Sequence, residues 1–424
     1  MSAVSTRRVF LKQYLGISTF LSLAPAVPAL LGRAAFGAFP REDRDTILVV
    51  LQLAGGNDGL NTVVPYADDE YGRARYTLRL TANEVLKIDS LLGWHPRMKG
   101  FARLFAEGHL AVIQGVGYPN PHQGHFESMR IWQTARLEEA SSCRTGWLGQ
   151  AIDSVYRPEH AQVPALFVGQ IERPFALSAR RAIVPWIDSL RQCVMSSMPG
   201  ADAASHRNWL TELAAAERSA RLNPMLQFVQ QSTLAARATS RRIEAAAETL
   251  GPTRTPDYPP FHLARMLRTI AQLIRADLPI RIYFTELGGP EPGGFDNHAG
   301  QRDNHAALLE QLSESVTAFA DDLRLANLLD RVLLMTFSEF GRTVRENGRR
   351  GTDHGSAAPM FLVGGRVRGG LIGAHPNLTE LENGGQRFHT DFRRVYATVL
   401  ERWLGFDSQL ALGARFDPLD VLTT

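Results

Sequence analysis

The sequence has very little cysteine. Cys143 and Cys193 are the two cysteines among 424 residues, so at most one disulfide can form within the chain. In an oxidising compartment these two could pair, and two free buried thiols explain them equally well. Internal repeats and low-complexity tracts are also lacking. With 44% hydrophobic and 21% charged residues, the composition is that of a globular protein with a large core, in one large domain or two smaller ones.

The chain also lacks an uninterrupted apolar run that would suit a membrane span. Its stretch 13–31 is mostly apolar but is interrupted by Gly16, Ser18, Ser22, Pro25 and Pro28. The stretch follows "TRRVFLK" (6–12) and precedes small residues at 34–38, an order typical of a twin-arginine export signal, with a membrane anchor as the alternative. We expect the twin-arginine translocase to export the chain, residues 1–37 to be the signal, and residues 38–424 to be periplasmic or secreted without a stable membrane span.

Neither sign of charge dominates. The chain has 46 Lys and Arg against 43 Asp and Glu, a net charge of +3. Residues 1–37 hold four of the basic residues and no acid, so without them the count is 42 against 43, or −1. The basic pI of 9.0 therefore does not indicate a nucleic-acid partner, and we expect none.

Short runs of apolar and β-branched residues predict buried strands, and three- and four-residue apolar spacing predicts helices. The predicted strands are 46–53, 109–116, 165–168, 279–285, 332–337 and 360–363; the predicted helices include 261–276, 301–328 and 391–404. Strands that alternate with helices favour an α/β three-layer sandwich with a mainly parallel sheet. The Ala-, Arg- and Glu-rich residues 200–260 predict a helical insertion.

The polar residues that follow each strand are the candidates for a site, because ligands collect at the carboxyl ends of the strands in such sheets. The first strand ends in "LAGGNDGLN" (53–61), where Asp58 is a candidate metal ligand. An ordinary glycine-rich turn, with Asn57 and Asp58 in left-handed conformations, is the alternative.

The second strand is followed by "GVGYPNPHQGHFESMRIW" (115–132), in which a helix is expected to begin near Phe126. The segment around Gly124 then lies at a helix N-terminus, which favours anions. His122, His125 and Glu127 are its polar candidates. A plain helix cap with exposed histidines explains the same pattern.

The richest segment is "GGFDNHAGQRDNHAALLEQL" (293–312). Asp296 and His298 are two residues apart, so in extended backbone their side chains face the same way and can share one ion. His305 heads the apolar stripe of the predicted helix, which favours a core or supporting role.

Two later segments complete the set. "TFSEFGRT" (336–343) places Glu339 and Arg342 beyond a strand, and "GTDHGSAAPMFLVGG" (351–365) places Asp353 and His354 before another. Arg342 is either a surface arginine or a clamp on an oxyanion. Carboxylates and imidazoles at four strand ends predict a mixed oxygen and nitrogen site for Zn²⁺, Mn²⁺ or a similar ion.

These segments, with "LVVLQLAGGNDGLNTVVPY" and "HPRM", resemble the twin-arginine-exported family 1501 of domains of unknown function. The resemblance covers nearly all of residues 38–424. That family is grouped with the alkaline phosphatase and sulfatase-like superfamily. The resemblance implies the superfamily's fold, two divalent ions (Zn, Mn or Ca) above a mixed sheet, and cleavage of phosphate or sulfate esters.

Carried onto this chain, the superfamily's metal ligands fall on Asp58, Asp296, His298 and His354. Glu339 and Asp353 would complete or orient that set. The superfamily's late Asp-His pair falls on Glu339 and Phe340, so one imidazole is missing. Relatives commonly have Ser-His-Phe where this chain has Gly124, His125 and Phe126, so the usual nucleophilic hydroxyl is missing too.

We therefore expect an exported metal-dependent hydrolase of a phosphate or sulfate ester, on a small molecule or a polymer. Its ions would polarise the ester oxygen and activate water near neutral pH. Arg342 would steady the substrate oxygens, and His125 would donate a proton or support a ligand. The alternative is a non-catalytic periplasmic binding or assembly protein on the same scaffold, which Gly124 and the missing imidazole favour.

Overall fold

The computed structural model describes residues 46–156, 164–170, 173–182, 184–188, 256–288 and 294–423. The predicted signal 1–37, Cys193 and residues 200–255 of the predicted insertion lie outside these ranges. Cys143 is half-buried. Among the described helices, none has the length and apolar character needed to cross a membrane.

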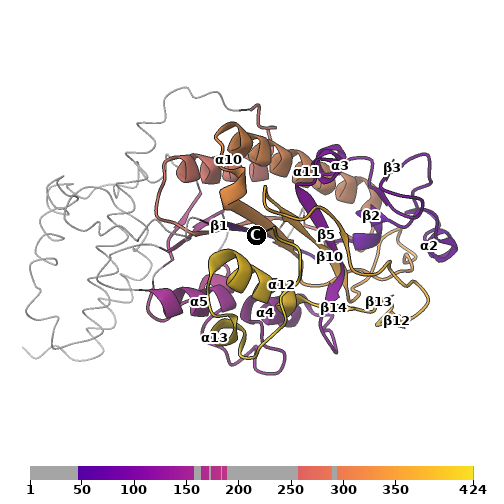
Figure 1. The fold of residues 1–424 in the computed structure, drawn as a ribbon. Coiled ribbons are helices and arrows are strands. Elements are labelled where there is room, and N and C mark those ends of the chain that lie inside the picture. The colour runs from indigo at the N-terminus through magenta and orange to yellow at the C-terminus, as the bar shows by residue number, and fades with distance from the viewer. Residues whose placement is uncertain are drawn as a thin grey trace, which may run out of the picture.

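A central sheet of nine strands organises the described residues (Figure 1). Its order is β11 (Gly370–Ile372), β5 (Leu110–Gly117), β10 (Ala358–Val363), β9 (Val332–Phe337), β1 (Ile47–Leu53), β8 (Ile282–Leu287), β6 (Ala165–Val168) and β7 (Trp186–Ile187), and β14 (Thr390–Asp391) also pairs with β5. Strand β10 runs antiparallel to β5 and β9, whereas the other pairs described in this sheet are parallel. The mainly parallel sheet is therefore confirmed, and all six predicted strands are present.

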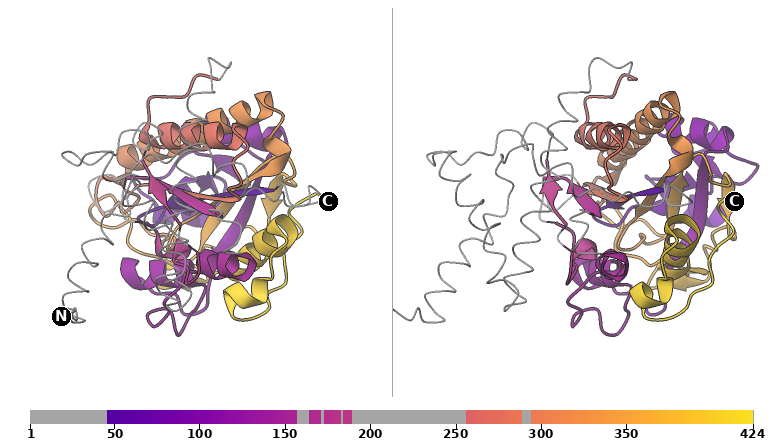
Figure 2. Two further views of the ribbon diagram at one scale, coloured as in Figure 1. Left: turned by 90° about the vertical axis from the view of Figure 1, so that its left-hand side faces the viewer. Right: turned by 60° about the vertical axis from the view of Figure 1, so that its left-hand side comes forward.

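Helices cover both faces of the sheet and form the outer layers of the predicted sandwich (Figures 1 and 2). One layer contains α3 (Lys99–Ala106), α10 (His262–Arg275) and α11 (Gln301–Leu325); the other contains α4 (His125–Thr134), α5 (Trp147–Val155), α12 (Phe392–Ala397) and α13 (Ser408–Leu412). Helix α12 continues as a π-helix over Thr398–Leu404. Alternate residues along β1 face the two layers, with Leu48 and Val50 in one core and Val49 and Leu51 in the other, as the two-residue period of a strand requires.

Small elements lie beyond the main sheet. They are the sheet of β2 (Val63–Val64), β4 (Gly93–Trp94) and β3 (Leu86–Lys87), the helix α2 (Asp69–Ala74), and the hairpin of β12 (Leu381–Glu382) and β13 (Gly385–Gln386). Figure 1 shows α2, β2, β3 and the hairpin gathered at one end of the molecule. The loops that carry the predicted site residues leave the carboxyl ends of β1, β5, β8 and β9.

Candidate metal centre

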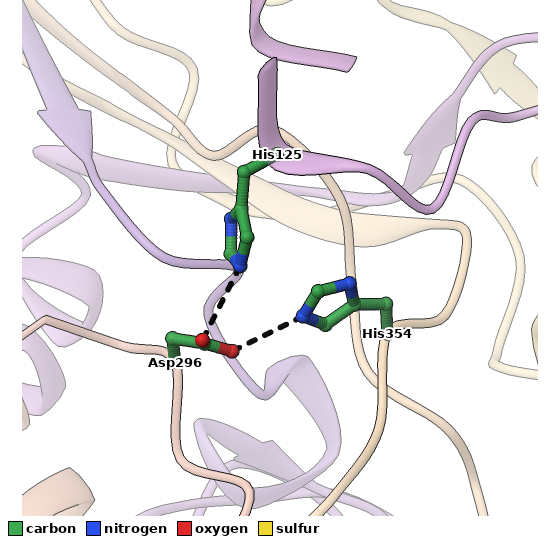
Figure 3. Close-up of side chains that lie close together, drawn as sticks. All are labelled: His125, Asp296 and His354. Atoms are coloured by element: carbon green, nitrogen blue, oxygen red, sulfur yellow. Dashed lines mark hydrogen bonds and ion pairs between the residues drawn. The ribbon is translucent and has the colours of Figure 1, made fainter. Parts of the chain in front are cut away.

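Three predicted histidines meet around the carboxylate of Asp296. The Nε2 atoms of His298 and His354 lie 3.0 and 3.1 Å from its Oδ1, and Nε2 of His125 lies 3.3 Å from its Oδ2. The two Nε2 atoms of His298 and His354 are themselves 3.0 Å apart. Figure 3 shows His125 and His354 approaching the carboxylate from two directions. Residues spread over more than two hundred positions thus converge on one point.

The fold supplies these side chains from three connections at the sheet edge. His125 is the first residue of α4, Asp296 and His298 lie in the loop before α11, and His354 lies between β9 and β10. Two of these loops touch, because a Cβ added at Gly351 would lie 2.3 Å from the main-chain carbonyl carbon of His298. A glycine at 351 therefore permits the close approach that brings His354 to His298.

Each of the three imidazoles is held from behind through its Nδ1 atom. The pairs are His125 with Oε1 of Glu339 at 2.9 Å, His298 with Oδ1 of Asp353 at 3.1 Å, and His354 with the carbonyl of Gln123. Carboxylates and carbonyls accept hydrogen bonds, so Nδ1 carries the proton in each ring. In the neutral ring Nε2 then has a free lone pair, the arrangement that metal-binding histidines commonly have. Glu339 and Asp353, expected either to complete the ligand set or to orient it, contact Nδ1 of His125 and of His298.

Electrostatics differ among the residues of the cluster. Burial raises the pKa of Asp296, but the hydrogen bond and charge of Arg342 outweigh it and lower that pKa to about 2. Burial lowers the pKa of His354, which favours the neutral ring. The hydrogen bond to Glu339 raises the pKa of His125, which favours its protonated form. His354 is thus suited to bind a cation and His125 to donate a proton.

The donor set fits a divalent metal ion. Nε2 of His298, Nε2 of His354 and Oδ1 of Asp296 all carry lone pairs and lie 3.0 to 3.1 Å from one another. Three acceptors this close repel one another unless a positive charge lies between them. Within the described ranges, possible metal-ligand atoms of His125, Asp296 and His354 also lie within 4.8 Å of one another. Two imidazoles and a carboxylate are ligands typical of Zn²⁺, whereas Ca²⁺ prefers oxygen alone.

Arg342 lies behind Asp296, away from the open side of the cluster. Its side chain is fully buried and donates to Oδ1 of Asp296 at 2.6 Å. Its other bonds go to main-chain carbonyls, those of Gly55, Gly56, Phe295 and Thr352. A buried guanidinium with these partners cannot reach substrate oxygens in this arrangement. The geometry therefore corrects the expected role: Arg342 positions Asp296 and the turn after β1.

Asp58 does not join the cluster, contrary to expectation. Its carboxylate is buried and forms a two-point ion pair with Arg75, with distances of 2.6 and 3.0 Å. Gln301 donates a third hydrogen bond to it. The attraction of Arg75 outweighs the effect of burial and lowers the pKa of Asp58 to about 2. A shared ion between Asp58 and Asp296 has no support in these contacts.

The helix N-terminus beside the cluster carries no hydroxyl. Gly124 is the N-cap of α4, and its side-chain position lies near the exposed end of Glu127. Ser128 lies one turn further on, where its buried hydroxyl is shared between Tyr118 at 2.8 Å and the carbonyl of Glu339. Ser128 thus links α4 to the end of β9 and is not presented to the cluster.

Phe340 and Gln123, to which the sequence gives no role, complete the site. Phe340 stacks on His354, with ring centroids 4.4 Å apart, and lies 4.9 Å from the ring of His125. It thus forms an apolar wall beside the two imidazoles. The side-chain amide of Gln123 donates to the carbonyl of His354 at 2.8 Å, in addition to the contact from its own carbonyl. A glutamine in a Pro-rich loop carries no sequence signal for such a role.

With this fold and this cluster, the chain is an α/β protein with a candidate metal centre at the carboxyl edge of its sheet. It belongs to the family described as "Protein of unknown function (DUF1501)", which matches residues 111–411. No curated protein matches the chain.

Several solved structures are similar to this chain. One is the PsFucS1 sulfatase from Pseudoalteromonas sp., which is 12% identical, with a TM-score of 0.41, covering 89% of this chain and 71% of that chain. Another is the phosphonate monoester hydrolase of Agrobacterium radiobacter, which is 9% identical, with a TM-score of 0.35, covering 87% and 78%. A third is the C-terminal periplasmic domain of EcEptC from Escherichia coli, in complex with Zn, which is 10% identical, with a TM-score of 0.34, covering 75% and 72%. At these identities the functions of those proteins do not transfer to this chain.

Proposed function

We propose that the protein is an exported, metal-dependent hydrolase of phosphate or sulfate esters. The convergence of lone pairs from His298, His354 and Asp296, each held by a partner from behind, is the observation that carries this proposal. In a protein without such a function, three mutually repelling acceptors at a partly exposed position would destabilise the folded state, and nothing would favour keeping them.

The cluster divides into ligands and a proton donor. Asp296, His298 and His354 would hold the ion, and three protein ligands are the number typical of catalytic zinc sites. A divalent cation bound there supplies Lewis-acid polarisation of the ester oxygen and lowers the pKa of water.

His125 has the properties of a general acid in this scheme. Glu339 fixes its ring through Nδ1 and favours its charged form, so Nε2 can donate a proton to the leaving oxygen. Water is the nucleophile, because Gly124 has no hydroxyl and that of Ser128 is buried. Asp353 keeps His298 oriented, as Arg342 does for Asp296.

Variants at two residues test this division of roles. The full-length protein, exported by its native host, is assayed for bound metal by mass spectrometry and for hydrolysis of an aryl phosphate and an aryl sulfate. Asp296→Asn is expected to lose both metal and activity. His125→Gln is expected to keep the metal and lose at least about 100-fold in activity.

The matched control is Asp303→Asn, an exposed acid in the first turn of α11, which should change neither readout. A wild-type protein that binds neither Zn²⁺ nor Mn²⁺ after supplementation would exclude the proposal and leave the binding or assembly role. Metal binding without hydrolysis of either ester would exclude the catalytic part.

A further inference from the structure

We infer that the site holds one metal ion per chain, because Arg75 serves as the permanent counter-charge of Asp58. This inference rests on the proposed function and sharpens it, since the family resemblance implies two ions. It concerns the number of ions and the role of Asp58, and is independent of the ester that is cleaved.

Every N–H group of the buried Arg75 side chain has a hydrogen-bond acceptor. Its side chain is fully buried, and its Nε donates to the carbonyl of Val344 at 2.6 Å. Its two terminal nitrogens donate to both oxygens of Asp58, to Oδ1 of Asn61 at 3.1 Å and to the carbonyl of Thr343 at 3.0 Å. Five N–H groups thus have five partners, the full capacity of a guanidinium. No rotation could release Arg75 from Asp58 without leaving several of these groups unpaired in the interior.

Both carboxylate oxygens of Asp58 are likewise occupied by hydrogen bonds. Each of its oxygens accepts from Arg75, and Oδ2 also accepts from Gln301. A dication bound at Asp58 would have to displace the guanidinium or lie against it in a buried, low-dielectric place. Displacement would leave a buried cation unpaired, and coexistence would bring like charges together, so both routes are unfavourable.

Further groups separate Asp58 from the cluster. Gln301 accepts from the hydroxyl of Thr352 at 2.6 Å, and the carbonyl of Thr352 accepts from Arg342 at 3.1 Å. Arg342 then reaches Asp296. The hydrogen-bonded route from Asp58 to Asp296 therefore passes through a second buried guanidinium. Across the residues that the structure describes, the ligand atoms of His125, Asp296 and His354 lie within 4.8 Å of one another, and Asp58 is not part of that group.

Metal stoichiometry tests this inference directly. The full-length protein is saturated with Zn²⁺, freed of loosely bound metal by gel filtration, and analysed for metal and protein content. One ion per chain is expected. Two ions per chain would overturn the inference and leave the proposed function standing, whereas no ion would defeat the proposed function itself.

Variants at the ion pair provide the second test. Asp58→Asn is expected to keep one ion per chain with a Zn²⁺ affinity within about 3-fold of wild type, because Asp58 is not a ligand. A loss of 100-fold or more would overturn the inference. If Asp58→Asn does not fold, the double variant Asp58→Asn, Arg75→Met removes both buried charges together, which proteins tolerate better than removal of one. Asp296→Asn is the matched control and should lose the ion.

Discussion

Glu339 accepts a hydrogen bond from Nδ1 of His125 at 2.9 Å, and the contact joins the end of β9 to the first residue of α4. The same oxygen accepts from the backbone N–H of Gly55 at 2.8 Å, so the carboxylate is fixed by the turn after β1. A buried acid thereby sets both the orientation and the charge of an imidazole whose Nε2 faces Asp296. This is a carboxylate–histidine pair of the kind that supports catalytic groups.

Glu339→Gln tests that relationship. The amide retains the shape but lacks the negative charge that favours protonated His125, so hydrolysis should fall by about 10- to 100-fold. Bound metal should stay at the wild-type level, because the variant leaves Asp296, His298 and His354 untouched. The measurements are kcat, KM and metal content. Glu127→Gln, an exposed acid on α4, is the control, and equal losses in both variants would refute a specific role for Glu339.

Gly124→Ser places a hydroxyl at the start of α4. The backbone there is extended (φ −83°), so serine fits, and its Cβ needs only the exposed end of Glu127 to move. Serine and glycine differ by only a few tenths of a kcal/mol at an N-cap, so stability should barely change. If wild-type hydrolysis uses water, intact mass spectrometry during turnover should show no phosphorylated or sulfated wild-type chain. A covalent adduct on the wild-type protein would contradict that route; one on the variant alone would show that serine reaches the ester.

Ser128→Ala tests whether the hydroxyl of Ser128 stabilises the fold or takes part in hydrolysis. The variant leaves the hydroxyl of Tyr118 and the carbonyl of Glu339 without their shared partner inside the protein. Unfolding free energy should fall by about 1–3 kcal/mol, the usual cost of an unsatisfied buried group. Hydrolysis under conditions where the protein is folded should be retained within a few-fold. A total loss of activity in a well-folded variant would mean that Ser128 takes part in the reaction.

The strands were predictable because their signal is local. Residues 332–337 and 165–168 are short apolar runs with polar neighbours, and the structure places β9 and β6 at these bounds. The antiparallel direction of β10 was not predictable, since a buried run has the same composition in either direction. The spacing 391–404 predicted a helix, but a π-helical turn follows α12, and apolar spacing does not distinguish the two.

The candidate metal ligands could be predicted from the sequence, but the residues that form hydrogen bonds and ion pairs with the predicted site residues could not. Asp296, His298 and His354 stand out because acids and histidines follow strands, and the fold brings them together. Asp58 carries the same signal, yet its neighbour in space is Arg75, which sits at the end of an ordinary charged helix. Sequence spacing cannot show that a buried arginine will pair with a given acid. His305, predicted as a core or supporting histidine, is buried, and its Nε2 lies 3.0 Å from Oδ1 of Asn57.

Another buried acid, Glu286, lies outside the cluster, at the end of β8. Glu286 is almost fully buried, and its Oε2 has no hydrogen-bond partner within the described structure. Burial alone raises its pKa from 4.5 to about 8. Between these two values the unfolded chain has lost this proton while the folded chain retains it. Because the folded state binds more protons, stability falls as pH rises from about 4.5 to about 8, and the penalty is constant above that range.

Glu286→Gln should therefore stabilise the protein in a pH-dependent way. The amide is neutral at every pH, so the gain should be smallest near pH 5, reach roughly 1–3 kcal/mol at pH 7 and level off above pH 8. Urea unfolding of metal-saturated wild type and variant at pH 5, 6, 7 and 8 measures the difference. Glu314→Gln, at an exposed position on α11, is the matched control and should show no such trend. A gain that is the same at all four pH values would mean that Glu286 ionises in the folded protein as it does in the unfolded chain, and that its burial carries no electrostatic penalty.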